Sequence, residues 1–542
     1  MHSPPFYNTE ARTLRAFRRL WIAFMVAVTS LPYLLNFFST PVGYRYTWIL
    51  PPYPEDSLAY QAWSQQAAHG RLLFQIKYTA LPHAAFLFHP FFLVAGWMSA
   101  LPGCDIGIVL WALKAVGVAL FFVTFFKYAD YLGLSGFQSI AASILVGLSS
   151  GFGGLLAFCD LAALSPVLRP ADLWVVDANT FFSLLWNPLF PYSLTLMLLA
   201  IYWLDRGTRE ARKSDFWWSG LATGILALIH PYSQPLLFAF AIIIAALRRR
   251  MAAPAYLWRH FLVLLPFLLY VVWVAAFHPL VSRHNATGVM KSPAPVAYVL
   301  GFGFPLLLAA AGLVMGRGQL LKRYWHIVLW FLLSVAFAYL PVWFQRKLIF
   351  SAHVPLCIMA GIGFDLLLAR FSNARARKEA LIAAVVIFLP LLASTPMYLL
   401  ASQSAQVREN AAGAYFISNE MMAGLKFLKN RSKPDEVVFA TPATSRLIPA
   451  LAGNTVLWGH WAMSVDIKER TKWVENLFDE HADWDDPRRG REFWGTGIQY
   501  IFADGGLKQS LEQKPEKWRV ILGEADKVFA NGSVVIYRHR KK

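Results

Sequence analysis

The sequence predicts a mainly α-helical membrane protein, with about eleven transmembrane helices in residues 1–400 and an extracytoplasmic α/β domain in residues 401–542. Of the 542 residues, 57% are apolar and only 15% are charged, which excludes an ordinary soluble multidomain chain. The charges are uneven, since residues 1–400 hold 29 Lys or Arg and 13 Asp or Glu, whereas residues 401–542 hold 21 and 18. The chain therefore divides into a charge-depleted membrane region and a water-exposed domain.

Apolar runs that can cross a bilayer, which needs about 20 residues per helix, recur between short loops. We place spans at 20–39, 107–127, 137–157, 180–204, 216–230, 234–247, 261–277, 298–315, 324–341, 348–369 and 380–400. The apolar segment 83–101 would be a further span, but counting it would invert every later loop. We therefore expect it to be a juxtamembrane or re-entrant helix against the outer leaflet.

The distribution of Lys and Arg orients these spans. Twenty basic residues fall on one side, at Lys127 and around 12–19, 206–213, 248–259, 317–323 and 370–378, and only eight fall on the other. Cytoplasmic loops carry such an excess, so we expect a cytoplasmic N-terminus and, with an odd number of spans, an extracytoplasmic C-terminal domain. The net charge of +19 thus indicates membrane topology, and no nucleic-acid partner is expected.

The first external loop, from residue 40 to 103, is longer than a connection requires, and such loops often carry function. Its centre reads Pro51-Pro52-Tyr53-Pro54-Glu55-Asp56-Ser57. The prolines stop any helix, and Asp56 or Ser57 can cap the next one. Asp56 is therefore either a helix cap or a general base beside the membrane, with Glu55 as its acidic neighbour.

Further acidic residues lie in the external segment 158–180, which contains Asp160, Arg169, Asp172, Asp177 and Asn179. With Glu55, Asp56 and Asp105, six of the 13 acidic residues of the membrane region fall on the outer face. They are either solvated loop charges or the wall of one cavity. Their oxygens suit Mg²⁺ or Mn²⁺, but they show no tight metal-ligand spacing, so a divalent cation stays open and no other cofactor is expected.

Several other polar groups lie near the predicted outer boundary. His230, in His230-Pro231-Tyr232-Ser233-Gln234, is a turn residue or a site residue. Arg346 and Lys347 would anchor to lipid headgroups or bind a substrate phosphate, because Arg presents a fork that matches phosphate oxygens. Lys114 is a charge inside a span, and it is either functional or reaches the headgroups. No phosphate loop, dinucleotide fingerprint or His-Glu-x-x-His motif occurs, so soluble-nucleotide chemistry has no visible site.

The C-terminal region alternates predicted strands and amphipathic helices. We expect strands at 436–440, 455–458, 498–502 and 534–537, and helices at 419–429 and 465–478. The aromatic segment Trp458-Gly459-His460-Trp461 would pack in this domain or line an acceptor groove. A small α/β domain follows.

This arrangement resembles the GT-C superfamily of polyprenyl-phosphate-sugar-dependent glycosyltransferases, such as protein O-mannosyltransferases, aminoarabinose transferases and oligosaccharyltransferase catalytic subunits. The shared features are one span, a large external loop with an early acidic residue, a bundle of about a dozen spans and an external C-terminal domain. Neither Trp458-Gly459-His460-Trp461 nor Trp484-Asp485-Asp486 reproduces the Trp-Trp-Asp motif of oligosaccharyltransferases, which argues against transfer to peptide asparagine.

The resemblance implies a transferase in which the first-loop carboxylate, here Asp56 with Glu55 beside it, is the catalytic base or orients the acceptor. Cations at the outer boundary would bind the donor phosphate, and the candidates are Arg346, Lys347, Lys114, Arg169 and Arg283. The acceptor would be a glycan, a lipid or a protein. We expect the following groups around the sugar or the acceptor: Tyr53, Asp172, Asp177, His230, Trp458 and His460. We expect the protein to lie in a bacterial inner membrane. A transporter or flippase of a lipid-linked sugar is the alternative, but no internal repeat is visible and the polar groups gather at one face.

Overall fold

The computed structural model describes residues 5–159, 168–248, 253–282, 289–371, 373–409, 413–478 and 483–540, so Asp160 and Arg283 lie outside the described residues. The chain forms two compact units. The membrane unit comprises Met1–Pro32, Ala112–Trp273 and Val289–Ser404. The loop-domain unit comprises Tyr33–Trp111, Val274–Gly288 and Ala405–Lys542, so the long first loop groups with the C-terminal residues.

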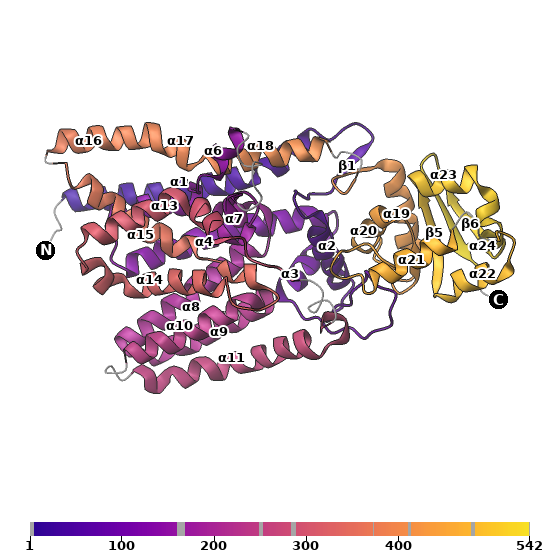
Figure 1. Ribbon diagram of the computed structural model, residues 1–542, viewed down its shortest axis with the longest axis horizontal. Helices are drawn as coiled ribbons and strands as arrows, with labels where there is room; N and C mark the ends of the chain where they lie inside the picture. The colour runs from indigo at the N-terminus through magenta and orange to yellow at the C-terminus, as the bar shows by residue number, and fades with distance from the viewer. Residues whose placement is uncertain are drawn as a thin grey trace. The chain divides into compact units, whose positions relative to one another are not determined.

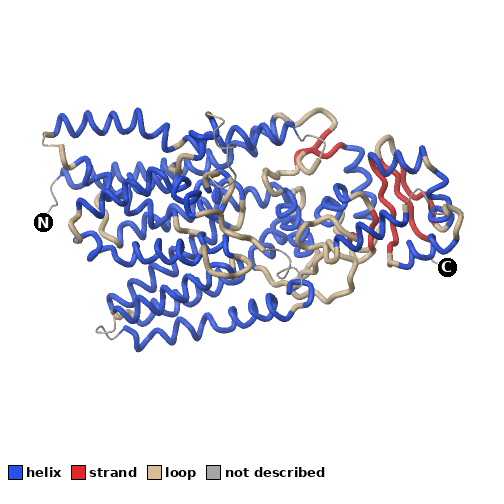
Figure 2. Tube along the Cα trace, in the orientation of Figure 1, coloured by secondary structure: helices blue, strands red, loops and turns tan. Residues whose placement is uncertain are grey.

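The membrane unit is built from helices, as the tube in Figure 2 shows. Its helices are α1 (Pro5–Phe38), α4 (Ile106–Tyr131), α5 (Gly136–Leu148), α6 (Gly153–Phe158), α7 (Thr180–Trp186), α8 (Phe190–Glu210), α9 (Lys213–Ile229), α10 (Gln234–Leu247), α11 (Leu257–Val272), α13 (Pro295–Met315), α14 (Gln319–Phe337), α15 (His353–Leu368), α16 (Ala374–Ala383), α17 (Leu389–Leu392) and α18 (Ser394–Glu409). The ends of α1 and α4 extend into the loop-domain unit.

Seven helices in the described part of the chain are long and apolar enough to cross a membrane: Arg12–Phe38, Ile106–Tyr131, Leu257–Phe277, Pro295–Met315, Gln319–Phe337, Gln345–Leu368 and Ala374–Glu409. These helices indicate an integral membrane protein. The predicted spans 137–157 and 180–204 are each divided into two helices, with breaks after Leu148 and after Trp186. The count of about eleven spans therefore stays a prediction.

Helix α15 lies at the centre of the membrane unit, since most of the apolar window in Gln345–Leu368 is buried. Small residues let its neighbours approach closely. A Cβ on Gly363 would lie 2.1 Å from the Leu308 carbonyl oxygen of α13, and one on Gly361 would lie 2.8 Å from the Ala142 backbone nitrogen of α5. Side chains at these glycines would force α13 and α5 away from α15.

The loop-domain unit contains two sheets and all the named strands of the described chain (Figure 1). The larger sheet has the order β4-β3-β5-β7-β6, formed by β3 (Val437–Phe439), β4 (Thr455–Val456), β5 (Ile498–Asp504), β6 (Ala525–Ala530) and β7 (Val534–His539). Strand β3 is parallel to β4 and β5, whereas β7 is antiparallel to β5 and β6. The helices are α2 (Pro54–Ala68), α3 (Pro90–Ser99), α19 (Asn419–Arg431), α20 (Pro442–Leu451), α21 (Ile467–Leu477), α22 (Pro487–Gly495), α23 (Gly505–Gln513) and α24 (Arg519–Gly523). The predicted α/β character of this region is confirmed.

Helix α3 occupies the ambiguous segment 83–101. It has ten residues, which gives a length of about 15 Å, half of the roughly 30 Å hydrocarbon core. This length fits a juxtamembrane helix better than a span, and its membrane position stays a prediction.

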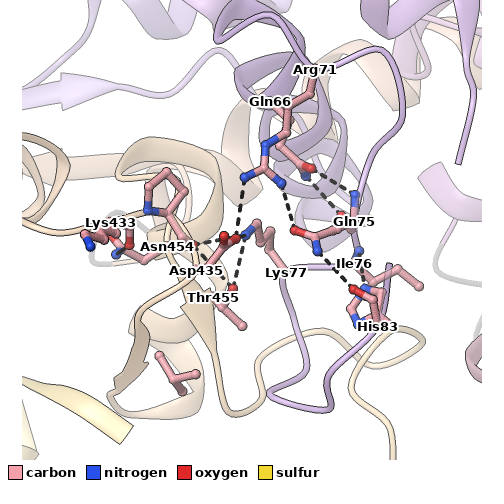
Figure 3. A network of polar contacts seen from close by, with 12 residues as sticks. Gln66, Arg71, Gln75, Ile76, Lys77, His83, Lys433, Asp435, Asn454 and Thr455 are labelled. Atoms are coloured by element: carbon pink, nitrogen blue, oxygen red, sulfur yellow. Dashed lines mark hydrogen bonds and ion pairs between the residues drawn. The ribbon is translucent and has the colours of Figure 1, made fainter. Parts of the chain in front are cut away.

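Two sets of contacts within the loop-domain unit join the first loop to the C-terminal residues. Strand β1 (Tyr44–Tyr46) pairs antiparallel with β2 (Phe416–Ser418). The buried Lys77 donates from Nζ to Asp435 Oδ1 at 2.7 Å and to the Pro434 carbonyl oxygen at 3.0 Å (Figure 3). Arg71 reaches the same Asp435 carboxylate at 3.6 Å. Asp56 therefore stands on a loop that is fixed to the C-terminal domain.

Candidate functional site

Asp56 lies in the first turn of α2, but it does not cap that helix. The N-cap is Tyr53, whose side chain makes no capping hydrogen bond, and Pro54 occupies the first helical position, where its fixed φ and missing N–H are tolerated. Glu55 and Asp56 follow in the first turn, where the helix dipole favours carboxylates. The interpretation of Asp56 as a helix cap was wrong, because Pro54 starts the helix before Asp56.

The two carboxylates of this turn have different partners. Glu55 Oε1 forms an ion pair with Arg446 Nη1 of α20 at 2.8 Å. The Arg446 carbonyl oxygen also accepts the hydroxyl of the buried Tyr78 at 3.2 Å. Arg446 therefore compensates the charge of Glu55 and fixes its side chain.

Asp56 faces a histidine instead of an arginine. Its Oδ1 lies 3.6 Å from Nε2 of His460, and the Asp56 side chain keeps 30% of its exposure whereas that of His460 keeps 2%. For Oδ2, no hydrogen bond or ion pair is found within the described ranges. One oxygen of Asp56 thus has no polar partner within the described ranges, while the other faces the imidazole.

The aromatic groups expected near the acceptor lie in different surroundings. Tyr53 is half-buried at the start of α2. Trp458 is buried, and its indole Nε1 donates to the Ala440 carbonyl oxygen at 3.0 Å, which favours the packing interpretation for this residue. His460 packs between rings, with Tyr78 at 5.3 Å and Trp461 at 6.2 Å between centroids.

A second polar cluster lies in the membrane unit and is centred on Asp177. This buried carboxylate lies 3.4 Å from Lys347 Nζ and 3.9 Å from His230 Nε2. Burial alone would raise the pKa of Asp177, but the positive charge of Lys347, the neighbouring His230 and Arg346 together bring it below its ordinary value. Asp177 is therefore ionised at neutral pH, and Lys347 balances its charge.

Arg346 adds a second cation to this cluster. Its guanidinium lies over the Trp174 ring at 5.4 Å, and its Nε is buried without a hydrogen-bond partner. The backbone holds it in place, because Arg346 N–H donates to the Met290 carbonyl oxygen at 3.0 Å and Met290 N–H donates to the Trp343 carbonyl oxygen at 2.7 Å. With Asp177 balanced by Lys347, the cluster has one positive charge in excess.

His230 ends helix α9 and turns the chain towards α10. Its ring is buried, and Nδ1 lies 2.8 Å from Ser233 Oγ in the following turn. His230 is therefore a turn residue, as one of the two interpretations expects, and its Nε2 lies near Asp177; its role in a site stays a prediction.

Asp172 and Asp177 have separate partners, although both come from the segment 158–180. Asp172 Oδ2 accepts from Gly151 N–H at 3.0 Å and from the Thr395 hydroxyl at 2.7 Å. Burial raises the pKa of Asp172 to about 7. Asp172 therefore ties the break after α5 to the start of α18.

The other two predicted phosphate ligands differ sharply in exposure. Lys114 is 1% exposed, and its ammonium donates to the carbonyl oxygens of Thr29 at 2.6 Å and Leu185 at 3.1 Å. The alternative in which Lys114 reaches the headgroups was wrong, because carbonyl groups inside the helix bundle bind its ammonium. Arg169 is exposed.

Arg446, Tyr78 and Trp174 belong to these clusters, but no local sequence pattern marks them. Their contacts join residues that are far apart in the chain. Across the described ranges, no group of three or more His, Cys, Asp or Glu side chains is placed to hold a metal ion.

Comparisons with known proteins give structural likeness only. No protein-family model matches the chain, and no curated protein matches it by sequence. Among solved structures, the oligosaccharyltransferase of Archaeoglobus fulgidus tethered with an acceptor peptide gives a TM-score of 0.51 at 12% identity, over 97% of this chain and 74% of that chain. The arabinofuranosyltransferase AftD from Mycobacteria gives 0.52 at 15% identity, over 97% of this chain and 40% of that chain. ArnT from Cupriavidus metallidurans bound to undecaprenyl phosphate gives 0.48 at 11% identity, over 95% and 97%.

The first two of these likenesses support the predicted resemblance at the level of the fold. The chain shares its fold with this oligosaccharyltransferase and this arabinofuranosyltransferase, at 12% and 15% sequence identity.

Proposed function

We propose that this protein is a membrane glycosyltransferase that moves a sugar from a polyprenyl-phosphate-linked donor to an acceptor hydroxyl on the extracytoplasmic face. The oligosaccharyltransferase and the arabinofuranosyltransferase with this fold are both named for glycosyl transfer, and we extend that activity to this chain. Helices able to cross a membrane suit a donor whose isoprenoid tail stays in the bilayer.

The observation that carries the proposal is the difference between Glu55 and Asp56. Arg446 pairs with Glu55 at 2.8 Å, so the guanidinium already occupies this carboxylate. Asp56 has no cationic Arg or Lys partner among the described residues, and it remains partly exposed. A base must be able to take a proton from the acceptor, so we assign that role to Asp56 and a supporting role to Glu55.

In the proposed reaction, the oxygen of the acceptor hydroxyl attacks the anomeric carbon of the donor sugar. Asp56 accepts the proton that this hydroxyl loses. The bond between that carbon and the donor phosphate oxygen breaks, and the polyprenyl phosphate leaves with the electron pair. Cations stabilise such a departing phosphate, and Arg346 with Lys347 is the pair we assign to it.

Substitution of the two neighbouring carboxylates tests this assignment. Asp56→Asn keeps the shape but cannot accept a proton at neutral pH, so we expect transfer to be abolished in a folded protein. Glu55→Gln should only reduce transfer, because the base is kept while Arg446 loses its partner. Asp105→Asn is the matched control in the same unit, since Asp105 forms a half-exposed ion pair with Arg45 at 2.6 Å. Near-normal transfer by Asp56→Asn would refute the role of Asp56.

We also propose a bacterial inner-membrane location with the loop-domain unit outside the cytoplasm. The support is the excess of Lys and Arg in alternate predicted loops. A divalent cation remains part of the proposal only as an activator to be tested, by assaying transfer with EDTA and then with added Mg²⁺ or Mn²⁺.

A further inference from the structure

His460 is held in a tautomer that directs an N–H group at Asp56. Two backbone N–H groups, those of Ala462 and Met463, donate to His460 Nδ1 at 3.0 Å and 3.3 Å. Nδ1 must therefore carry a lone pair, and in a neutral imidazole the proton then lies on Nε2.

The polar group that this Nε2 faces is the Asp56 carboxylate. His460 is buried, and its Nε2 has no hydrogen-bond partner. The Asp56 Oδ1 atom lies 3.6 Å away, just beyond hydrogen-bond distance. A buried donor without a partner is costly, so a small movement of the Asp56 side chain would satisfy it.

The surroundings keep the imidazole in this orientation. His460 N–H donates to Ser464 Oγ at 3.0 Å, which closes the turn around the histidine. The rings of Tyr78 and Trp461 limit rotation of the imidazole.

We propose that His460 is a positioning residue for the base: its neutral Nε2–H holds Asp56 Oδ1 and thereby directs Oδ2 at the acceptor hydroxyl. This inference rests on the proposed function and assigns His460 a role through Asp56 instead of direct contact with the sugar. A neutral donor fixes the carboxylate without placing a full positive charge beside it.

Two substitutions separate this role from a purely structural one. In His460→Asn, the side-chain oxygen can still accept the N–H groups of Ala462 and Met463, as in an Asx turn, but no donor reaches Asp56. In His460→Gln, the longer amide carries a donor to the position of Nε2. We expect His460→Asn to keep its melting temperature and lose about tenfold to a hundredfold in kcat with little change in KM, and His460→Gln to recover much of kcat.

The full-length protein in lipid nanodiscs, with ¹⁵N-labelled histidine, gives an independent readout. The signal that disappears in His460→Asn should report an unprotonated Nδ1 and a protonated Nε2.

The outcomes distinguish this inference from the proposed function. If Asp56→Asn abolishes transfer while His460→Asn has normal kcat, the positioning role is refuted and the assignment of Asp56 stands. If His460→Gln is as impaired as His460→Asn, or the signal reports a protonated Nδ1, the inference also fails. If Asp56→Asn transfers normally, the proposed function itself is refuted.

Discussion

The most informative perturbation of the membrane unit is removal of the Arg346 guanidinium. Asp177 and Lys347 balance each other at 3.4 Å, so Arg346 supplies the excess positive charge of this cluster. A charge-assisted hydrogen bond to a donor phosphate contributes about 1.5–3 kcal/mol, which corresponds to a loss of about tenfold to 150-fold on truncation. We therefore expect Arg346→Ala to raise KM for the lipid-linked donor, or lower kcat/KM, by at least tenfold.

The Lys variant gives the geometric test. Arg346→Lys keeps a positive charge but replaces a planar fork with a point charge, so it should stay impaired if the phosphate contact is bidentate. If Arg346 only anchors the protein to headgroups, both variants should leave transfer nearly unchanged.

Lys347 has to be tested with a different variant, because it forms an ion pair with the buried Asp177. Lys347→Ala leaves Asp177 buried and uncompensated, which costs about 3–5 kcal/mol of stability and would mask any effect on the donor. In the double variant Lys347→Met with Asp177→Asn, that unpaired charge is absent, so the protein should fold while donor affinity stays reduced.

The assay is the initial rate of transfer against donor concentration for purified protein in lipid, with monodispersity checked for each variant. If Arg346→Ala, Arg346→Lys and the double variant all match the parent, the phosphate site lies elsewhere. Arg169 would then be the next candidate.

Three further predictions concern stability and topology. Burial raises the pKa of Asp172 to about 7. The folded state therefore holds a proton that the unfolded state releases above about pH 4. The free energy of unfolding should fall by up to about 4 kcal/mol as the pH rises from 4 to 7. Asp172→Asn should remove this slope in thermal melts at pH 5 and pH 8, and an unchanged slope would contradict it. Lys77→Met should lower the stability of the loop-domain unit by about 1–2 kcal/mol. Arg71 is a partly exposed partner of Asp435 at 3.6 Å, so Arg71→Ala should cost less than about 1 kcal/mol. Equal losses of stability in limited proteolysis would show that Lys77 is not the principal contact. A periplasmic reporter fused after Lys542 should be active and a cytoplasmic one inactive, and the reverse would mean that 83–101 spans the membrane.

Local patterns in the sequence were enough to predict four strands and two helices of the C-terminal region, but β2, β6, α20, α22, α23 and α24 were missed. Strands β3, β4, β5 and β7 and helices α19 and α21 all lie within the predicted segments or extend them by a few residues. Strand β6 was missed because Asp526 and Lys527 interrupt its apolar alternation. Helix α20 was missed because it contains Pro442 and Pro449, residues that normally argue against a helix.

Hydropathy located the apolar runs but not the breaks within them. The chain leaves helix α5 at Ser149 and helix α7 at Asn187, although apolar residues continue on both sides. At Asn187, a side-chain oxygen accepts Leu189 N–H at 2.9 Å, and such local bonds compete with helix formation. A window average over about 20 residues does not resolve them.

In the candidate site, too, local features could be predicted from the sequence, whereas contacts between residues far apart in the chain could not. The helix start with Glu55 and Asp56 was visible because prolines precede it. The pairing of Glu55 with Arg446 and of Asp56 with His460 was not, since these contacts join opposite ends of the chain. The balance between Asp177 and Lys347 likewise depends on packing that no motif encodes.

The central claim is that the protein breaks the bond between sugar and phosphate, and one measurement tests it directly. Purified protein in liposomes containing a polyprenyl-phosphate-linked sugar would be incubated with acceptor, and free polyprenyl phosphate and glycosylated acceptor would be quantified together. We predict that both appear in equal amounts with the parent protein and that neither appears with Asp56→Asn. Movement of the intact lipid-linked sugar across the bilayer, with no free polyprenyl phosphate, would contradict this account and identify a transporter.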